Sequence, residues 1–210
     1  MSWNVQIVPV GPLQMNAALL TSKGPEPVAV LVDPGDEPER LLQLVEDSGC
    51  PLVGLLATHG HFDHVGAAAA IQEVHDLPLR CHREDVPLIE NMNHIQAAYG
   101  FPSTKLPLVL ADLQDGQVLK FGEDELLVTH VPGHSPGQVM FTFSGAAVVG
   151  DCLFAGSVGR TDLPGGDYPT LEKSIRERIY ALADETVVYC GHGPDTTVGR
   201  EKATNPFVRA

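Results

Sequence analysis

The sequence is short of basic residues, and this shortage limits the partners that the protein can bind. Lys and Arg together number 13 against 27 Asp and Glu, which gives a formal net charge of −14. Binding to nucleic acid needs a basic surface for the phosphates, so we expect no nucleic-acid partner. An anionic substrate would need local positive charge at its site, from bound cations or from a few basic side chains.

Cysteines are also few, and long apolar runs are missing. Cys50, Cys81, Cys152 and Cys190 lie far apart without a Cys-x-x-Cys pair, so we expect reduced, mostly buried thiols and no disulfide framework. No apolar stretch approaches the roughly 18 residues of a membrane-spanning helix, and the N-terminus lacks the features of a secretion signal. These absences predict a cytoplasmic protein that makes no contact with a membrane.

The chain does carry the pattern of a mixed α/β protein. It is 43% hydrophobic, as ordinary globular domains are. Apolar and β-branched runs predict strands at Val5–Val10, Asn16–Ser22, Val28–Val32, Leu52–Thr58, Glu125–His130, Gln138–Phe143, Ala146–Val149 and Thr186–Cys190. Helical periodicity predicts helices between residues 36 and 49 and at Asp63–His75, Asp85–Tyr99 and Pro169–Ala183. This order predicts an α/β (α+β) layered fold, one domain over residues 1–210, with a loop at Gly100–Gly116 joining two halves.

The segment Thr58–His64, Thr-His-Gly-His-Phe-Asp-His, is the strongest functional signal in the chain. It places three imidazoles and one carboxylate within six positions, directly after the apolar run Leu52–Ala57. Polar ligands at the end of a buried strand lie at the edge of its sheet, where neutral imidazoles and an ionised carboxylate suit zinc, iron or manganese. We therefore predict a metal site at this edge.

Three further predicted strands end on residues of the same chemical type. His134 follows one strand in a Pro/Gly turn, Asp151 ends a second, and His192 follows a third. A single Asp or His in such a place usually caps a turn, but histidines rarely gather where loops begin. Five His and two Asp exceed the four ligands of a closed structural zinc site and suit two adjacent ions with open positions, which indicates catalysis. The remaining histidines are expected to be structural or solvated, without such partners: His75, His82, His94 and His130.

These positions resemble the signature of the metallo-β-lactamase superfamily, which is His-x-His-x-Asp-His followed by a distal His, a bridging Asp and a final His. Within that superfamily the chain is most similar to the short bacterial hydroxyacylglutathione hydrolases (glyoxalase II), in which Gly-Arg-Thr-Asp-Leu-Pro-Gly-Gly-Asp (159–167) and Cys-Gly-His-Gly-Pro-Asp-Thr-Thr (190–197) recur. The resemblance extends from Asp33-Pro-Gly to Asn205-Pro-Phe. It implies an αββα sandwich with the metal site at one edge, between the two sheets.

The resemblance also implies a role for each residue of the signature. The implied ligands are His59, His61 and His134 for a first metal, Asp63, His64 and His192 for a second, and Asp151 as the bridge between them. Asp33 would support the site from behind, through hydrogen bonds that orient the ligands, although an Asp in Asp-Pro-Gly also fits a plain turn. The two divalent ions would be zinc, with iron or manganese as alternatives.

Two adjacent cations would make hydrolysis possible without a nucleophilic side chain. They lower the pKa of a shared water to about 7, so a bridging hydroxide can attack, oriented by Asp63. The resemblance implies S-D-lactoylglutathione or a similar acylthiol as the substrate. Arg160 would grip a carboxylate of glutathione, or would instead pair within its own loop with Asp162 or Asp167. We expect no counterpart of the C-terminal helical domain that supplies further glutathione contacts in larger glyoxalase II enzymes.

A second function shares the Gly-Arg-Thr-Asp segment. Persulfide dioxygenases bind one Fe(II) with two His and one carboxylate, and here His59, His134 and Asp151 would contribute to that site, beside His61. The sequence leaves this oxidoreductase open as the alternative to the hydrolase. A purely structural metal site would not need seven ligands from separate strand ends. The sequence determines neither the identity of the metals nor the oligomeric state.

Overall fold

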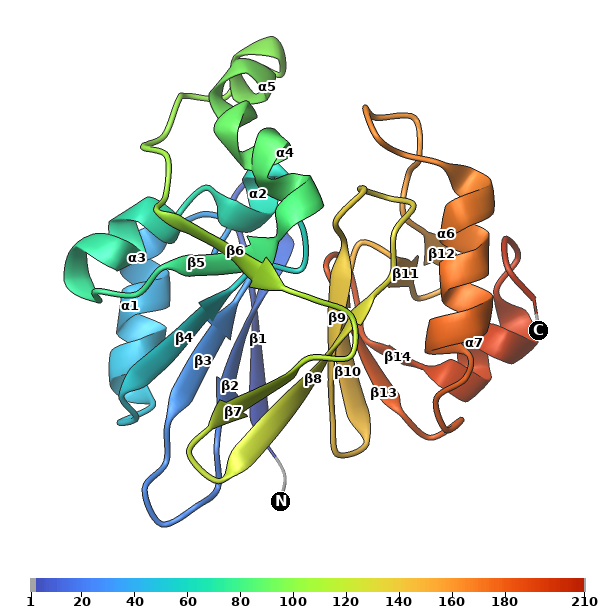
Figure 1. The fold of residues 1–210 in the computed structure, drawn as a ribbon, viewed down its shortest axis with the longest axis horizontal. Coiled ribbons are helices and arrows are strands. Elements are labelled where there is room, and N and C mark those ends of the chain that lie inside the picture. Colours follow the sequence, from blue (N-terminus) through green and yellow to red (C-terminus); the bar gives the residue numbers. More distant parts are fainter. Residues whose placement is uncertain (1–2, 210) are drawn as a thin grey trace.

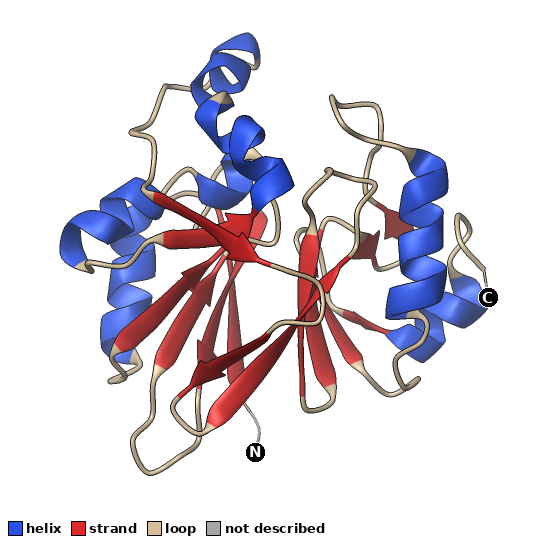
Figure 2. Cartoon of the chain, viewed as in Figure 1, coloured by secondary structure: helices blue, strands red, loops and turns tan. Residues whose placement is uncertain are grey.

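The computed structural model describes residues 3–209 and consists of two β-sheets packed face to face, with helices on both outer sides (Figures 1 and 2). The first sheet comes from the N-terminal half of the chain and the second from the C-terminal half. This arrangement confirms the expected αββα sandwich.

The first sheet has six strands, which lie side by side in the order of the sequence. They are β1 (Asn4–Val10), β2 (Met15–Thr21), β3 (Ala29–Val32), β4 (Leu52–Leu56), β5 (Leu79–His82) and β6 (Val109–Leu113). β1, β2 and β3 pair antiparallel, whereas β3, β4, β5 and β6 pair parallel. The parallel strands therefore end at the same edge, and the loop after β4 carries the segment Thr58–His64 to that edge.

The second sheet also has six strands, in the spatial order β14-β13-β10-β9-β8-β7. These strands are β7 (Val118–Phe121), β8 (Asp124–His130), β9 (Val139–Phe143), β10 (Ala146–Gly150), β13 (Val187–Cys190) and β14 (Thr196–Thr197). A two-stranded hairpin, β11 (Leu153–Phe154) with β12 (Ser157–Val158), follows β10. β10 and β13 pair parallel, so Asp151 and His192 emerge at the same edge of the sheet.

The helices cover the two outer faces and the edge where the strand ends meet (Figure 1). On the first sheet lie α1 (Pro38–Asp47) and α3 (Ala68–Val74), and on the second α6 (Tyr168–Ser174), its continuation η2 (Ile175–Ile179) and α7 (Val198–Thr204). Near the metal-site edge lie α2 (Phe62–Val65), η1 (Arg83–Asp85), α4 (Val86–Glu90) and α5 (Met92–Ala98). No helix among residues 3–209 combines the length and the apolar character needed to cross a membrane.

The central strands are buried on both faces, which is why their sequences are almost wholly apolar. In β2, Ala17 and Leu19 join the cluster beneath α1 and α3, while Ala18 and Leu20 join the cluster between the sheets. Successive side chains of a strand point to opposite faces, so one run supplies two layers of core. A third cluster packs the second sheet against α6, η2 and α7. The four cysteines are free, and three of them are buried, as predicted.

Three sequence predictions about local structure are wrong. The expected loop Gly100–Gly116 contains β6, an edge strand whose outward side chains blur the apolar pattern. The expected helix Asp63–His75 is divided into α2 and α3, because the Ala67 backbone N–H donates to Pro34 O. The expected helix Asp85–Tyr99 is likewise divided, into α4 and α5 preceded by η1.

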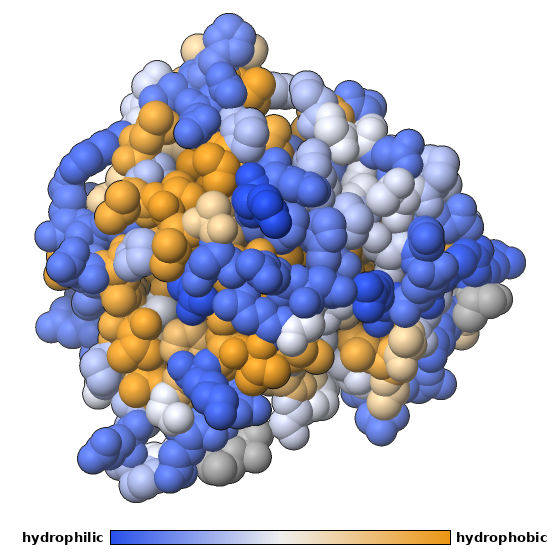
Figure 3. All heavy atoms as spheres, viewed as in Figure 1, coloured by the Kyte–Doolittle hydropathy of each residue, from blue (hydrophilic) through white to orange (hydrophobic). Residues whose placement is uncertain are grey.

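The two edge strands β6 and β7 expose apolar side chains on the face seen in Figure 3, where hydrophobic residues gather. Leu108 beside β6 is 70% exposed, and Val118 of β7 is 47% exposed. The inter-sheet core is closed by contrast, since Phe141 of β9 has no exposed surface.

Replacing Phe141 with alanine should therefore lower the free energy of unfolding by about 3–5 kcal/mol, because it leaves a cavity between the sheets. Urea denaturation followed by circular dichroism measures this change. Leu108→Ala is the control, and we expect it to change stability by less than about 0.5 kcal/mol. Equal effects of the two substitutions would contradict the burial assigned to Phe141.

Candidate metal centre

The structure brings the seven side chains of the signature together at one edge of the sandwich, between the two sheets. They come from the loop after β4, from α2 and from the loops after β8, β10 and β13: His59, His61, Asp63, His64, His134, Asp151 and His192. Their nitrogen and oxygen atoms form three overlapping groups, each with all atoms within 4.8 Å of one another. The groups are His59 with His61 and His134, His59 with His64 and Asp151, and Asp63 with His64 and His192.

Asp151 lies between the two outer groups and faces both. Its Oδ1 lies 3.3 Å from His64 Nε2, and its Oδ2 lies 3.6 Å from His192 Nε2 and 3.7 Å from His134 Nε2. Within the outer groups, His61 Nδ1 lies 2.9 Å from His134 Nε2, and Asp63 Oδ2 lies 3.3 Å from His192 Nε2. Two ligand sets thus share one carboxylate, as the sequence prediction requires of a bridging ligand.

Four of the five imidazoles are oriented by hydrogen bonds from Nδ1, which leave Nε2 directed into the cluster. His134 Nδ1 lies 2.7 Å from Arg160 O and His192 Nδ1 lies 3.1 Å from Leu13 O, so in both rings Nδ1 is the donor. His59 Nδ1 contacts the Thr58 hydroxyl. Such partners fix the tautomer and the ring plane of a metal-binding histidine.

Asp33 makes the corresponding bond to His64 and joins three segments behind the site. Its Oδ2 accepts from His64 Nδ1 at 2.9 Å and from the Thr58 hydroxyl at 2.7 Å, and its Oδ1 accepts from the Thr58 backbone N–H at 2.6 Å. The residue is 1% exposed and has a φ of +54°, a conformation unusual for a non-glycine residue. The sequence left a plain turn open for Asp33, whereas the structure shows its carboxylate orienting a predicted ligand.

The donor set suits divalent cations by its chemistry and by its unsatisfied atoms. His59 Nε2, His64 Nε2 and Asp151 Oδ1 are buried without a hydrogen-bond partner. A buried polar atom without a partner costs about 1–3 kcal/mol, and three such atoms in one cluster indicate a missing shared partner. Gly191 leaves the space they need, because a Cβ there would lie 2.1 Å from Asp151 Oδ1. The residues present therefore fit metal ions.

At neutral pH, the surroundings of His59, His61 and Asp151 hold these side chains in the protonation state that binds metal. Burial, and then the imidazoles of His64 and His61, hold the pKa of His59 well below its ordinary value. Burial and the neighbouring His134 lower the pKa of His61 to about 4. Both rings are therefore neutral at pH 7, which is the form that binds metal. Burial opposes ionisation of Asp151, but His64, His134 and His192 together outweigh it and hold the pKa of Asp151 far below its usual range.

Five of the seven side chains line a cleft of about 500 Å3, which we call the metal cleft: His61, Asp63, His134, Asp151 and His192. Its walls include Phe62, Tyr99 and Phe154, and Arg160 lies beside them. The Arg160 guanidinium makes two bonds to the Asp162 carboxylate, at 2.7 and 2.8 Å, so the pairing that the sequence allowed is present. Arg160 nevertheless borders the cleft.

Sequence reasoning missed Asp85, a fully buried carboxylate that connects the two loops carrying the ligands. It accepts from Gly60 N at 2.8 Å on one side, and from Ser135 Oγ at 2.7 Å and Gly137 N at 2.6 Å on the other. These donors flank His59, His61 and His134 in the sequence. No local pattern could identify Asp85, because all three of its partners lie far from it along the chain.

Two histidines outside the cluster contact each other. His82 at the end of β5 and His130 at the end of β8 are stacked, with ring centroids 4.4 Å apart. His130 Nε2 also lies 2.8 Å from Pro136 O. These contacts give His82 and His130 a structural role, one of the two roles expected of them, because the strand ends that carry them meet across the two sheets. His75 and His94 lie outside every ligand group found among residues 3–209.

Comparison with known proteins agrees with this geometry. The family model described as the metallo-beta-lactamase superfamily matches residues 10–192. The chain belongs to this superfamily. Its relatives include a protein named hydroxyacylglutathione hydrolase GloC from Haemophilus influenzae, 38% identical over 99% of both chains.

Solved structures of the superfamily superpose closely on the chain. TTHA1623, solved in a di-iron-bound form, is 46% identical, with a TM-score of 0.88 over 97% of this chain and 100% of that one. BLEG-1, named a B3 metallo-beta-lactamase, is 35% identical, with a TM-score of 0.85 over 99% and 100%. ETHE1 from Myxococcus xanthus shares the fold at 23% identity, with a TM-score of 0.77 over 98% and 84%. The His/Asp cluster thus lies in a chain with the metallo-β-lactamase fold, and its residues could hold metal ions.

The contacts of Asp33 predict a weaker metal site when its charge is removed. We expect Asp33→Asn to lower zinc affinity by about 10–100-fold, because an amide cannot accept hydrogen bonds from His64 and from both Thr58 donors at once. Titration against a competing chelator measures this affinity, with the exposed Asp47→Asn on α1 as the control. Unchanged zinc affinity in Asp33→Asn would show that the ligands keep their orientation without it.

The Asp85 contacts predict that a substitution of this residue lowers the stability of the protein. Asp85→Asn puts an NH2 group where a carboxylate oxygen accepts a hydrogen bond, so we expect the free energy of unfolding to fall by about 1–3 kcal/mol. Urea denaturation of the metal-free protein measures the loss. The partly exposed Asp112, paired with Arg80, is the matched control, and Asp112→Asn should cost about 1 kcal/mol or less. Equal losses of unfolding free energy in Asp85→Asn and Asp112→Asn would contradict the specific stabilising role of Asp85.

Proposed function

We propose that the protein is a dinuclear metal-dependent hydrolase of S-D-lactoylglutathione or a similar acylthiol. The observation that carries this proposal is the pair of ligand sets on either side of Asp151, with members of both sets lining an open cleft. Full-length similarity to a protein named hydroxyacylglutathione hydrolase supports the acylthiol as substrate.

The proposed ligands are those implied by the sequence: His59, His61 and His134 for one ion, Asp63, His64 and His192 for the other, and Asp151 for both. Zinc suits this donor set, and iron is equally compatible, since a similar protein was solved with two irons. Two bound cations would supply a hydroxide nucleophile at neutral pH and polarise the carbonyl of the substrate.

The chain's own residues would position the reactants. Burial raises the pKa of Asp63, but His64 and His192 together lower it below its usual value, so the carboxylate is ionised and can accept a hydrogen bond from the nucleophile. The aromatic rings of Tyr99 and Phe154 offer an apolar wall to the thiol portion. Arg160, released from or shared with Asp162, would bind a carboxylate of glutathione at the border of the cleft. The leaving thiolate departs toward solvent.

The direct test is an assay of S-D-lactoylglutathione with the metal-loaded protein. We expect hydrolysis that is abolished by chelation and by His59→Ala, because both remove metal from the cluster. The control His94→Ala changes a histidine on α5 outside the ligand groups and should leave turnover unchanged. A nitrocefin assay run in parallel covers β-lactam hydrolysis, which the similarity to BLEG-1 makes worth measuring. Absence of thioester turnover in the metal-loaded protein would refute the proposal.

The persulfide dioxygenase is the second candidate, favoured by the close grouping of His59, His61 and His134 with Asp151 near His134. It predicts one Fe(II) per chain and consumption of oxygen with glutathione persulfide. The hydrolase predicts two metals per chain and no such consumption. Metal analysis of protein purified without added metal, combined with an oxygen electrode, separates the two functions.

A further inference from the structure

The loop that carries His192 is held by the start of β2, a strand of the other sheet. Met15 forms an isolated antiparallel bridge with His192. The next residue, Asn16, donates its backbone N–H to Gly191 O at 2.7 Å. The position of His192 is therefore set by both halves of the chain, although the hydrolysis proposed above assigns no role to β2.

The side-chain amide of Asn16 holds the same loop on both sides of His192. Its Nδ2 donates to Cys190 O at 3.0 Å and to Gly193 O at 2.8 Å, which uses both of its hydrogens. Asn16 is only 7% exposed, so the amide is largely shielded from water. One buried side chain thus fixes the backbone before and after a predicted metal ligand.

His192 is the most exposed of the three ligands proposed for the second metal alone. Its side chain is 27% exposed, against 17% for Asp63 and 0% for His64. His64 is also oriented by the buried carboxylate of Asp33, whereas His192 extends from a loop outside the core. Packing holds His192 less firmly than His64, so the hydrogen bonds of its loop matter more for its position.

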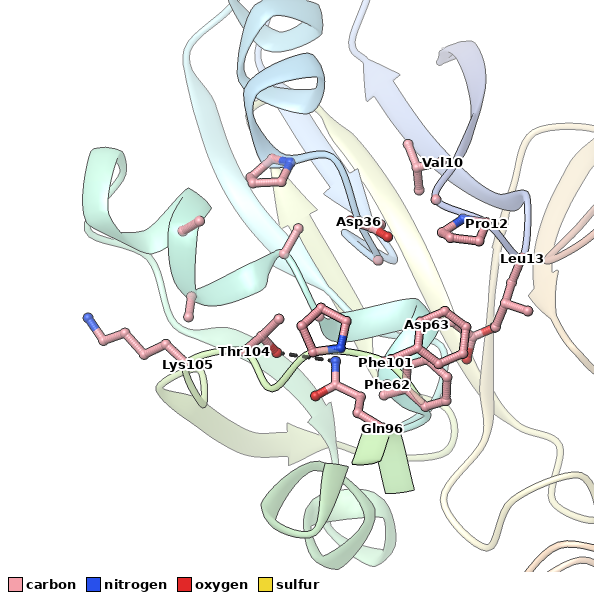
Figure 4. Close-up of a pocket in the computed structure, with 18 of the residues that line it drawn as sticks. Val10, Pro12, Leu13, Asp36, Phe62, Asp63, Gln96, Phe101, Thr104 and Lys105 are labelled. Carbon is pink, nitrogen blue, oxygen red and sulfur yellow. Dashed lines mark hydrogen bonds between the residues drawn. The ribbon is translucent and has the colours of Figure 1, made fainter. Parts of the chain in front are cut away.

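The turn between β1 and β2 supports the ring of His192. Leu13 O accepts the hydrogen bond of His192 Nδ1 at 3.1 Å. The Leu13 side chain lines the metal cleft together with Asp63, and both also line the smaller cavity shown in Figure 4. The segment from Leu13 to Asn16 thus contacts the ring of His192 and the backbone on either side of it.

The ligands proposed for the first metal are held by other contacts. Asp85 joins the loop of His59 and His61 to the loop of His134. In the part of the chain that the structure describes, Asn16 makes no hydrogen bond to either of these loops. A change at Asn16 should therefore act on one ligand set and spare the other.

We propose that Asn16 is a positioning residue for the second metal site, and that its amide determines whether the protein holds two metal ions or one. Without this amide, the loop of His192 would lose two hydrogen bonds, and His192 Nε2 would lose its fixed place beside Asp63 and Asp151. The first ligand set would still hold an ion. The inference rests on the two-metal site of the proposed function and is independent of the substrate.

Two substitutions of Asn16 test the proposal by metal content. Asn16→Ala removes both donors, and Asn16→Leu removes them while keeping the branched shape of the side chain. We expect both variants to bind one zinc ion as the unmodified protein does and the other about 10–100-fold more weakly, the usual effect of losing a residue that orients a ligand. Zinc titration against a competing chelator measures both affinities.

Cobalt substitution identifies which site is affected. With Co(II) in place of zinc, NMR detects the Nδ1–H protons of the metal-bound imidazoles at strongly shifted positions. His134 donates its Nδ1–H to Arg160 O, and His192 donates its own to Leu13 O, so both protons are protected in the unmodified protein. We expect the Asn16 variants to keep the signal of His134 and to lose that of His192.

Asn205→Ala is the matched control. Asn205 is also buried, and its Nδ2 also donates twice, to Ser157 O at 3.0 Å and to Glu201 Oε2 at 2.9 Å. Its hydrogen bonds reach no proposed metal ligand among residues 3–209. We expect this variant to lose stability in urea while it binds both zinc ions with unchanged affinity.

Several outcomes would overturn the inference. One is unchanged affinity for both ions in the Asn16 variants, and another is an equal weakening of both sites or the same loss in Asn205→Ala. Unfolding of both Asn16 variants where Asn205→Ala stays folded would also overturn it, because Asn16 would then serve the fold as a whole. Two bound ions without thioester turnover in the unmodified protein would refute only the proposed function, whereas a single bound ion would refute both.

Discussion

The metal centre depends on the hydrogen bonds that Asp33 makes from behind it. One buried carboxylate at the end of β3 accepts from the backbone and hydroxyl of Thr58, at the end of β4, and from His64 on α2. The Thr58 hydroxyl in turn contacts His59. A ligand of each proposed metal is thereby tied to the same anion, so the first sheet sets the spacing between His59 and His64.

The ligands from the second half of the chain are positioned by further polar contacts. Asp85 connects the loop of His59 and His61 to the loop of His134 by three hydrogen bonds. Near the opposite side, the Asn16 backbone N–H donates to Gly191 O at 2.7 Å, and its side-chain amide donates to Cys190 O and Gly193 O. Polar contacts therefore connect the two sheets where their ligand-bearing strand ends meet, and apolar packing fills most of the space between them.

Some elements could be predicted from the sequence and others could not, because some depend on local patterns and others on contacts between distant parts of the chain. Buried strands such as β2 and β3 were predictable, because burial on both faces leaves a continuous apolar run. The edge strand β6 was not, since it faces solvent and its apolar side chains follow no clear alternation. The break between α2 and α3 was equally hidden, because it results from a backbone hydrogen bond to Pro34.

The sequence by itself determined the donor types and the strand ends that carry them, because ligands for metal must have particular chemistry and must follow elements that end at one edge. It also carried the resemblance to the superfamily to which the chain belongs. The tertiary structure alone decided how the ligands are held and what surrounds them. The three hydrogen bonds of Asp85 and the His82–His130 stack both arise from contacts between residues far apart in the chain. Such contacts leave no local pattern, since each is set by how the two sheets pack.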